Sequence, residues 1–278
     1  MQLYNSISEQ TSRAITNVYS TSFASAVKML HSSIRQDIYN IYGFVRVADE
    51  IVDTFHEYDK EFLLNHFESD FYYAVEHGIS VNPVVQAFIS TLKKYSIDVE
   101  LVESFLKSMR MDLYKSNYLS KKEYEEYIYG SADVVGLMCL KVFVNGDEDL
   151  YQRLKPSAMK LGSAFQKVNF LRDLKSDTDI LNRSYFPNID FGNLNENSMN
   201  EIMKEIEMDF EQAFDGIIRL PETARFGVYT AYRYYKQLLK KLKRTHHSKI
   251  LQSRIRVNDY VKMALMMRSY INIKLNLL

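Results

Sequence analysis

Two pairs of aspartates carry the clearest chemical signal in the sequence. Asp49 and Asp53 form one Asp-x-x-x-Asp pattern, and Asp173 and Asp177 form a second one much later in the chain. In a helix, residues four apart lie one turn apart on the same face, so each pair presents two neighbouring carboxylates. Like charges so placed destabilise a bare helix, whereas Mg²⁺ binds such oxygens and bridges them to substrate phosphates. The pairs therefore indicate a metal site that binds phosphate groups.

The residues around the two pairs favour the same chemistry without proving it. A chain with this many aspartates contains about one such pair by chance, so two pairs are modest evidence. Arg46 lies one short turn before the first pair, while Gln166, Asn169 and Arg172 lie beside the second. Arginine binds phosphate oxygens, and neutral amides complete a polar lining. An arginine beside an aspartate is also found as an ordinary helix salt bridge, so both interpretations stay open.

The elements that position these residues are predicted to be helices. Glycine (9) and proline (4) are scarce, which leaves little material for the turns of a β fold. Apolar side chains recur at three- and four-residue steps in the long stretches 34–54, 120–143, 150–174, 202–218, 223–242 and 257–273. The clearest breaks are Asn82-Pro83, Asn145-Gly146, 187–195 and Leu220-Pro221. We expect an all-α helical bundle that forms a single domain over residues 1–278.

Composition excludes several classes of protein. Lys plus Arg and Asp plus Glu are equal at 35, so no overall field favours nucleic acid. Cys139 is the only cysteine, which excludes an internal disulfide framework and favours a reducing cytoplasm. The first ten residues lack the layout of a signal peptide, and the apolar stretch 134–144 is too short to span a bilayer. We predict a cytoplasmic protein with no nucleic-acid partner and no obligate protein partner.

A basic stretch near the C-terminal end is the local exception to the even charge balance. No Asp or Glu interrupts its eight basic residues, which are Lys236, Lys240, Lys241, Lys243, Arg244, Lys249, Arg254 and Arg256. A solvated helix end and loop is one interpretation, and contact with diphosphate or an anionic membrane surface is the other. The sequence favours neither.

Several motifs, taken together and in order, resemble the squalene and phytoene synthases. That family's first acidic helix is similar to 39–53 (YNIYGFVRVADEIVD), and its second is similar to 165–173 (FQKVNFLRD). Further matches are Thr21-Ser22-Phe23, 127–136 (YIYGSADVVG), 183–187 (RSYFP) and Tyr234-Tyr235. There are two departures, because Asp133 stands where many members have glycine and Ile128 replaces a common cysteine. Asp133 could therefore alter the wall of the cavity.

The resemblance implies an isoprenoid synthase helical bundle in which both acidic helices line one central cavity. It implies that Mg²⁺, or Mn²⁺ in its place, is held by Asp49, Asp53, Asp173 and Asp177. It places the diphosphates against Ser22, Arg46, Gln166, Asn169, Arg172 and Tyr235. Phe23 would line the tail pocket, and Tyr127 would lie near the reacting carbons. The expected catalytic residues are Tyr127, Arg46 and Arg172.

The expected reaction is the head-to-head condensation of two geranylgeranyl diphosphates to phytoene, through a cyclopropyl diphosphate, in carotenoid biosynthesis. Val27 and Tyr39 are expected near the pocket floor, and the modest size of Val27 favours a C20 tail over a C15 tail. The alternatives are a squalene or dehydrosqualene synthase that uses farnesyl diphosphate, and a prenyl diphosphatase or non-catalytic relative. NADPH is expected only for squalene synthesis. Because these substrates are hydrophobic, transient association with a membrane surface is a reasonable hypothesis.

Overall fold

The described part of the chain is helical and contains no β-strand in the computed structural model. The structure describes residues 1–118, 120–179, 185–186, 196–250, 252–275 and 277, and no side chain among 176–179, 196–197 and 247–248. The first helices are α1 (Gln2–Tyr19), α2 (Thr21–Lys28), α3 (Ser32–Asp53), α4 (Lys60–His77), α5 (Pro83–Lys94), α6 (Val99–Tyr114) and α7 (Lys121–Ile128). The π-helix η1 (Tyr129–Asp133) follows, and then α8 (Val134–Phe143), α9 (Glu148–Asp179), α10 (Glu196–Ile217), α11 (Glu222–Lys243), α12 (His247–Ile250) and α13 (Asp259–Lys274). The prediction of an all-α fold is confirmed.

Helix boundaries follow local sequence signals. The carboxylate of Asp59 accepts a hydrogen bond from the backbone N–H of Phe62 at the start of α4, and Gly78 ends that helix with a φ of 78°. Asn82 caps α5 in the same way, with Pro83 in its first turn. Ser120 and Glu123 form a capping box at the start of α7. The predicted breaks at Asn145-Gly146 and Leu220-Pro221 fall between helices, and Asn82-Pro83 falls at the start of α5.

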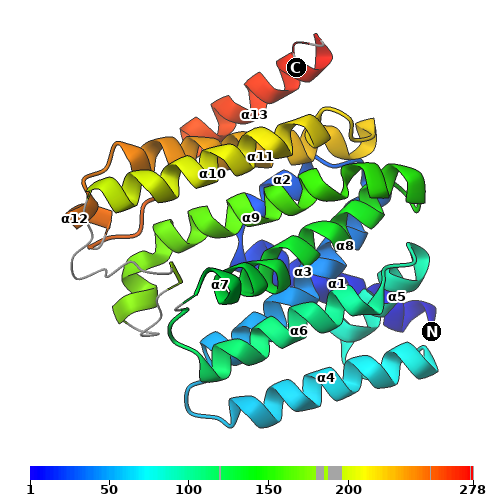
Figure 1. Ribbon diagram of the computed structural model, residues 1–278. Helices are drawn as coiled ribbons and strands as arrows, with labels where there is room; N and C mark the ends of the chain where they lie inside the picture. The colour runs from blue at the N-terminus through cyan, green and yellow to red at the C-terminus, as the bar shows by residue number, and fades with distance from the viewer. Residues whose placement is uncertain (119, 180–184, 187–195, 251, 276, 278) are drawn as a thin grey trace.

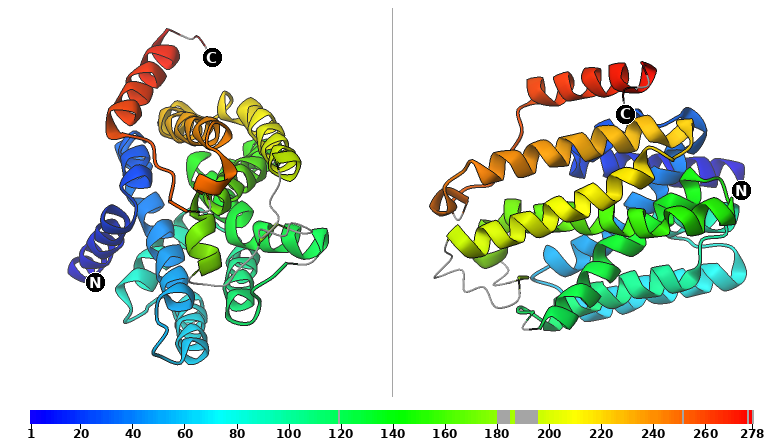
Figure 2. Two further views of the ribbon diagram at one scale, coloured as in Figure 1. Left: turned by 90° about the vertical axis from the view of Figure 1, so that its left-hand side faces the viewer. Right: turned by 45° about the horizontal axis from the view of Figure 1, so that its top comes forward.

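The helices pack in layers around α3 and α9. Figures 1 and 2 show α9, α10 and α11 side by side. On another side α9 packs against α8 and η1, and α6 packs in turn against these two. Below them, Phe44 of α3 stacks on Phe88 of α5, with 4.2 Å between the ring centroids. Phe67, Phe71 and Phe105 surround the same ring and bring in α4 and α6. This aromatic cluster holds α3, the first acidic helix, in a fixed position under α9.

The segment 120–143 differs from the regular helix that its periodicity predicts. It is divided into α7, η1 and α8, so one turn has π-helical rather than α-helical hydrogen bonding. Gly130 lies in this turn, where a Cβ atom would be 2.5 Å from the backbone oxygen of Ser104 in α6. Only glycine permits so close an approach of two helices. Such π turns are frequent at functional sites, and this one borders the cavity described next.

Candidate active site

A cavity of about 430 Å³ opens between α2, α3, η1, α8, α9, α10 and α11. One part of its wall is polar and contains Asp49, Asp53, Asp112, Gln166, Asn169, Arg172 and Asp173. The rest is mainly apolar and contains Val27, Leu30, Val135, Phe143, Leu161 and Ile217. A space with one charged region and one apolar region suits a ligand with a charged head and a hydrocarbon tail.

The first acidic helix, α3, brings Asp49 and Asp53 to the cavity wall. Arg46 lies behind them, bound to Glu50, stacked 4.6 Å from the ring centroid of Tyr19, and 3.9 Å from Asp49. Burial raises the pKa of Asp49 to about 8, and the charge of Asp53 adds to the rise while Arg46 opposes it. Burial and the neighbouring carboxylate therefore disfavour the charged form of Asp49.

The second acidic helix, α9, brings Gln166, Asn169, Arg172 and Asp173 to the same cavity. Burial alone would lower the pKa of Arg172, but the hydrogen bonds and charge of Asp173 outweigh it and raise that pKa. The hydroxyl of Tyr235 in α11 donates to Asn169 Oδ1 at 3.2 Å. Asp177 lies in the last part of α9, and its side chain is outside the described residues. The structure thus brings three of the four predicted metal ligands to one cavity.

Arg254, which sequence analysis did not single out by itself, also reaches the second acidic helix. Its Nε lies 2.7 Å from Asp173 Oδ1, although the two residues are far apart in the chain. The basic stretch therefore binds Asp173, a residue of the cavity wall, through a guanidinium that does not itself line the cavity. Half of the Arg254 side chain is exposed, so it can change partner without a large cost of burial.

The remaining predicted residues occupy different positions. Phe23 lines the cavity and stacks on Tyr42 at 4.6 Å between centroids, whereas Ser22 lies in the first turn of α2 and is not among the lining residues. Val27 lines the cavity, but Tyr39 does not, and its ring lies under Arg13 of α1. Arg183 and Pro187 are outside the described residues. Tyr185 is buried and stacks on Phe170.

Tyr127 is buried at the cavity wall and donates a hydrogen bond to Asp112 Oδ2 at 2.8 Å. The rings of Tyr118, Phe170 and Tyr185 pack around it. Sequence analysis missed Asp112, although a signal was present. Asp112 continues the buried face of α6 after Phe105 and Met109, and an acid at an apolar position of a helix indicates a partner or a ligand.

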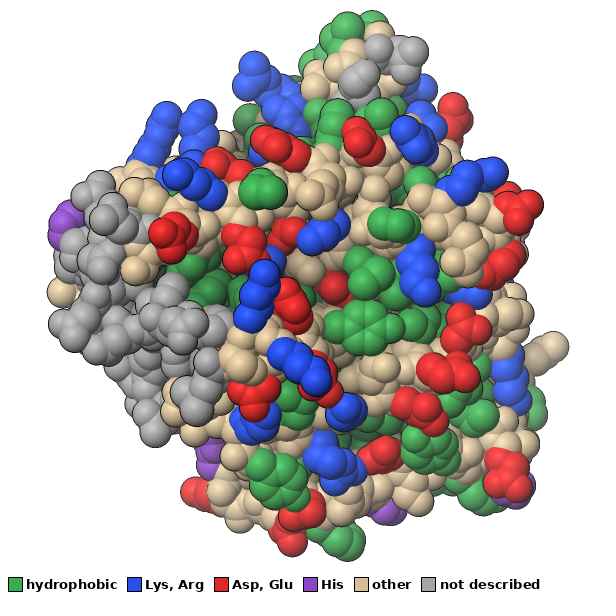
Figure 3. Space-filling model, in the orientation of Figure 1, with side chains coloured by type: hydrophobic (Ala, Val, Ile, Leu, Met, Phe, Trp, Pro, Cys, Tyr) green, Lys and Arg blue, Asp and Glu red, His purple; other side chains and the backbone are tan. Residues whose placement is uncertain are grey.

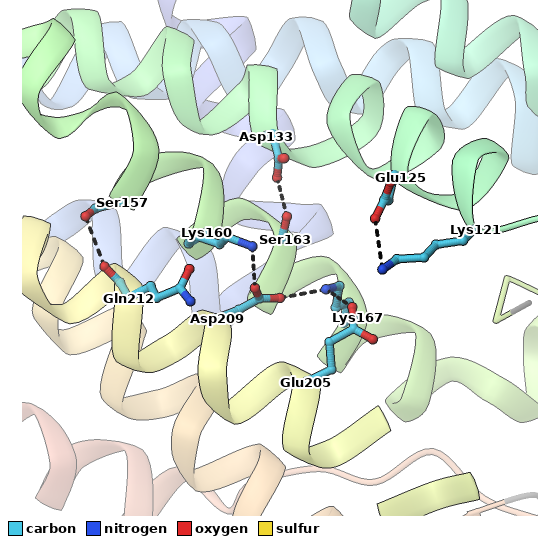
Figure 4. Close-up of polar contacts among 10 residues, drawn as sticks. All are labelled: Lys121, Glu125, Asp133, Ser157, Lys160, Ser163, Lys167, Glu205, Asp209 and Gln212. Atoms are coloured by element: carbon cyan, nitrogen blue, oxygen red, sulfur yellow. Dashed lines mark hydrogen bonds and ion pairs between the residues drawn. The ribbon is translucent and has the colours of Figure 1, made fainter. Parts of the chain in front are cut away.

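Asp133 is not among the residues that line the cavity, so its expected effect on the cavity wall is not found. It accepts a hydrogen bond from Ser163 of α9 at 2.7 Å (Figure 4). One turn along α9, Lys167 is bound to Asp209 and Glu205 of α10, as the same figure shows. Asp133, which departs from the family pattern, therefore links η1 to α9 through this hydrogen bond.

Asp133 makes stability depend on pH. Burial raises its pKa to about 7, although the Ser163 hydrogen bond and Lys167 lower it. The Asp133 carboxyl of the folded protein therefore keeps its proton up to about pH 7, whereas the unfolded chain releases it near pH 4. The contribution of this proton to the free energy of unfolding is lost as pH rises through 7. Asp133→Asn keeps a hydrogen-bond acceptor but does not titrate. We expect the Tm of the native protein, relative to this variant, to fall between pH 5 and 8, and parallel profiles would contradict the assignment.

The residues present fit a divalent cation whose coordination is completed by substrate. Within the described part of the chain, no three His, Cys, Asp or Glu side chains converge closely enough to enclose an ion alone. Mg²⁺ commonly takes one or two carboxylates and completes its octahedron with phosphate oxygens and water. Burial and the charge of Asp53 raise the pKa of Asp49, and a divalent cation between the two carboxylates would favour their charged forms. Asp49 and Asp53 on one wall and Asp173 on the other are the candidate ligands.

The chain is an all-helical bundle around a cavity with one polar and one apolar region, and comparison with known proteins gives its family. Over residues 16–260 the sequence matches squalene/phytoene synthase. The phytoene synthase of Arthrospira platensis is 27% identical, covering 90% of this chain and 88% of its own. The 15-cis-phytoene synthase of Synechocystis is 29% identical, covering 82% and 74%. The chain belongs to the squalene/phytoene synthase family, whose enzymes are prenyltransferases.

Solved structures support the same fold. A dehydrosqualene synthase in complex with a ligand superposes with a TM-score of 0.84 at 23% identity, covering 98% of both chains. A squalene synthase from Alicyclobacillus acidocaldarius gives a TM-score of 0.73 at 18% identity, covering 85% of this chain and 93% of its own. The predicted helical bundle around a central cavity is therefore confirmed.

Proposed function

We propose that this protein condenses two geranylgeranyl diphosphates head to head and forms phytoene in a Mg²⁺-dependent reaction. The observation that carries the proposal is the arrangement of Asp49, Asp53 and Asp173 around a cavity that continues between apolar helices. The similarity to phytoene synthases along most of the chain supports the C20 substrate. The small side chain of Val27 in the cavity wall is consistent with a long tail.

The first step is the departure of diphosphate from C1 of one substrate. Bound Mg²⁺ would neutralise the charge that grows on that diphosphate. Arg172 adds positive charge at the cavity wall, Arg46 and Arg254 add it through Asp49 and Asp173, and the Asn169–Tyr235 hydrogen bond orients the polar wall. Arg254 is half exposed, and we expect it to leave Asp173 and bind the diphosphate when the substrate enters.

The remaining steps take place in the apolar part of the cavity. The double bond of the second substrate attacks the allylic cation, and proton loss closes a cyclopropane that still carries one diphosphate. Departure of that diphosphate, rearrangement and a further proton loss give the hydrocarbon, with no net reduction and so no need for NADPH. Tyr127, held by Asp112 among stacked rings, offers an aromatic surface that stabilises cations. The helices around the cavity exclude water, which would convert a cation to an alcohol.

The proposal is tested by incubating the purified protein with each prenyl diphosphate, with Mg²⁺ or a chelator, and with or without NADPH. A Mg²⁺-dependent C40 hydrocarbon from the C20 substrate, independent of NADPH, is the expected product. A C30 hydrocarbon from the C15 substrate alone would overturn the choice of substrate. Prenyl alcohol as the main product would indicate a diphosphatase.

Val27→Trp tests the tail pocket. The larger ring would fill space in the cavity wall, so we expect kcat/KM for the C20 substrate to fall at least about tenfold relative to the C15 substrate. Ser25→Trp is the matched control, because Ser25 is exposed on the same helix. Equal effects of Val27→Trp on both substrates would show that the size of residue 27 does not determine which tail length the cavity accepts. Product analysis with both substrates distinguishes these results.

A further inference from the structure

The C-terminal helix α13 forms an outer layer on α11. Figure 2 shows it at the edge of the molecule, away from the central helices. Its inner face contains Ser269, which is fully buried, and Asn272, which donates to the hydroxyl of Tyr229 at 3.2 Å. Lys262 lies over the ring of Tyr234 at 5.7 Å from its centroid. The helix is therefore fixed on one side by specific contacts.

The outer face of α13 is apolar and exposed. Its side chains recur at steps of three and four residues, so they form one stripe along the helix. The exposed fractions are 85% for Tyr260, 56% for Met263, 58% for Met267, 47% for Ile271 and 64% for Leu275. Single exposed apolar residues are ordinary on a protein surface, but a continuous row of five marks a contact surface.

The charges beside this stripe are mainly basic. On α13 the exposed basic residues are Arg268 and Lys274, whereas Lys262 faces α11 and pairs with Asp259, the only acid of the helix. The last turn of α11 also contains Lys240 and Lys241, whereas its third lysine, Lys243, is paired with Glu207 of α10. In Figure 3, hydrophobic side chains lie next to Lys and Arg at the top of the molecule, where Figure 1 places α13. An apolar stripe with basic neighbours suits the boundary between lipid headgroups and acyl chains.

We infer that α13 lies in the surface of an anionic membrane and holds the protein there reversibly. Met263, Met267 and Ile271 enter the acyl boundary, while Arg268 and Lys274 contact lipid phosphates. Tyr260 and Tyr270 place aromatic rings at headgroup depth, where tyrosine is enriched. None of the described helices has an apolar stretch long enough to cross a membrane, so this contact is parallel to the surface.

The position of α13 relates this surface to the cavity. The helix contacts α11 through Tyr229 and Tyr234, while Gly227, Val228, Ala231 and Tyr235 of α11 line the cavity. One helix, α11, roughly 10 Å across, therefore separates the cavity from α13. This arrangement shortens the path that water-insoluble substrates and product take between the membrane and the cavity. This part of the inference rests on the proposed function.

The test is sedimentation of the full chain with vesicles, without substrate. We expect binding to vesicles that contain phosphatidylglycerol, weaker binding at high salt, and little binding to pure phosphatidylcholine. The triple substitution Met263→Gln, Met267→Gln and Ile271→Gln should lower the partition coefficient at least about tenfold, because three inserted apolar side chains are lost. The control carries Leu3→Gln, Ile7→Gln and Val18→Gln on α1, which are also exposed, by 76%, 47% and 79%.

Binding that is unchanged in the α13 variant, or equally reduced in the α1 control, would overturn the inference. So would a dimer in light scattering that the α13 substitutions dissociate, because the stripe would then be a contact between two copies. The circular dichroism spectrum and Tm should stay as in the native protein, since the side chains are exposed.

Product formation in detergent separates the two proposals. C40 product without vesicle binding overturns only the membrane contact, and vesicle binding without C40 product overturns only the proposed reaction.

Discussion

Asp49→Asn is expected to lower kcat/KM by at least about 10³-fold while leaving the protein folded. The substitution removes a carboxylate oxygen that would bind the cation and leaves Asp53 unable to replace it, so the departing diphosphate loses much of its electrostatic stabilisation. Turnover of geranylgeranyl diphosphate at saturating Mg²⁺ measures the loss. Asp149→Asn, an exposed aspartate in the first turn of α9, is the control and should keep full activity.

The stability of the Asp49→Asn variant gives a second, opposite expectation. Asp49 and Asp53 are neighbouring carboxylates in a cavity, and burial with mutual repulsion raises the pKa of Asp49 to about 8. Removing one of two crowded acids relieves repulsion, so the Tm without metal should stay the same or rise. Binding of Mg²⁺ with inorganic diphosphate, followed by calorimetry, should weaken in parallel with turnover. Full activity, or a large fall in Tm, would show that Asp49 is a structural residue.

The acidic helices could be predicted from sequence because local patterns specify them. The spacing of Asp49 and Asp53 puts both carboxylates on one face, and the apolar periodicity around them buries the opposite face of α3. Breaks such as Asn82-Pro83 and Leu220-Pro221 mark helix ends because proline cannot continue a helix from the preceding turn. The convergence of α3 and α9 on one cavity came from the resemblance to a family, since no local pattern encodes a contact between helices so far apart in the chain.

Other features depend on tertiary contacts that the sequence does not show. The π turn at Tyr129–Asp133 leaves the apolar periodicity almost unchanged, so 120–143 reads as a regular helix. Arg254 follows α12 in a non-helical segment, and only the folded chain brings it to Asp173. Asp133 could be recognised as unusual, but the direction of its carboxylate is set by Ser163 on another helix.

Lys167→Met is expected to cause the largest loss of stability, about 3–5 kcal/mol. Lys167 and Asp209 are both buried, and their charged atoms lie 2.6 Å apart between α9 and α10. The substitution leaves the Asp209 carboxylate in a poorly hydrated site. Lys160 also contacts it, at 3.0 Å, but is half exposed and compensates only in part. Thermal unfolding should show a fall in Tm on the order of 10 °C.

Two further variants separate a lost charge pair from lost packing. Lys243→Met removes an exposed ion pair with Glu207 between α11 and α10, which is worth about 1 kcal/mol or less. Lys167→Met combined with Asp209→Leu replaces both buried charges by apolar side chains, and Glu205 remains exposed enough to be hydrated. This double variant should recover most of the stability, because a buried pair replaced as a unit leaves no unpaired charge. If it is no more stable than Lys167→Met, the aliphatic part of Lys167, and not its charge, holds α9 against α10. The position of Asn169 and Arg172 on the same helix would then depend on packing alone.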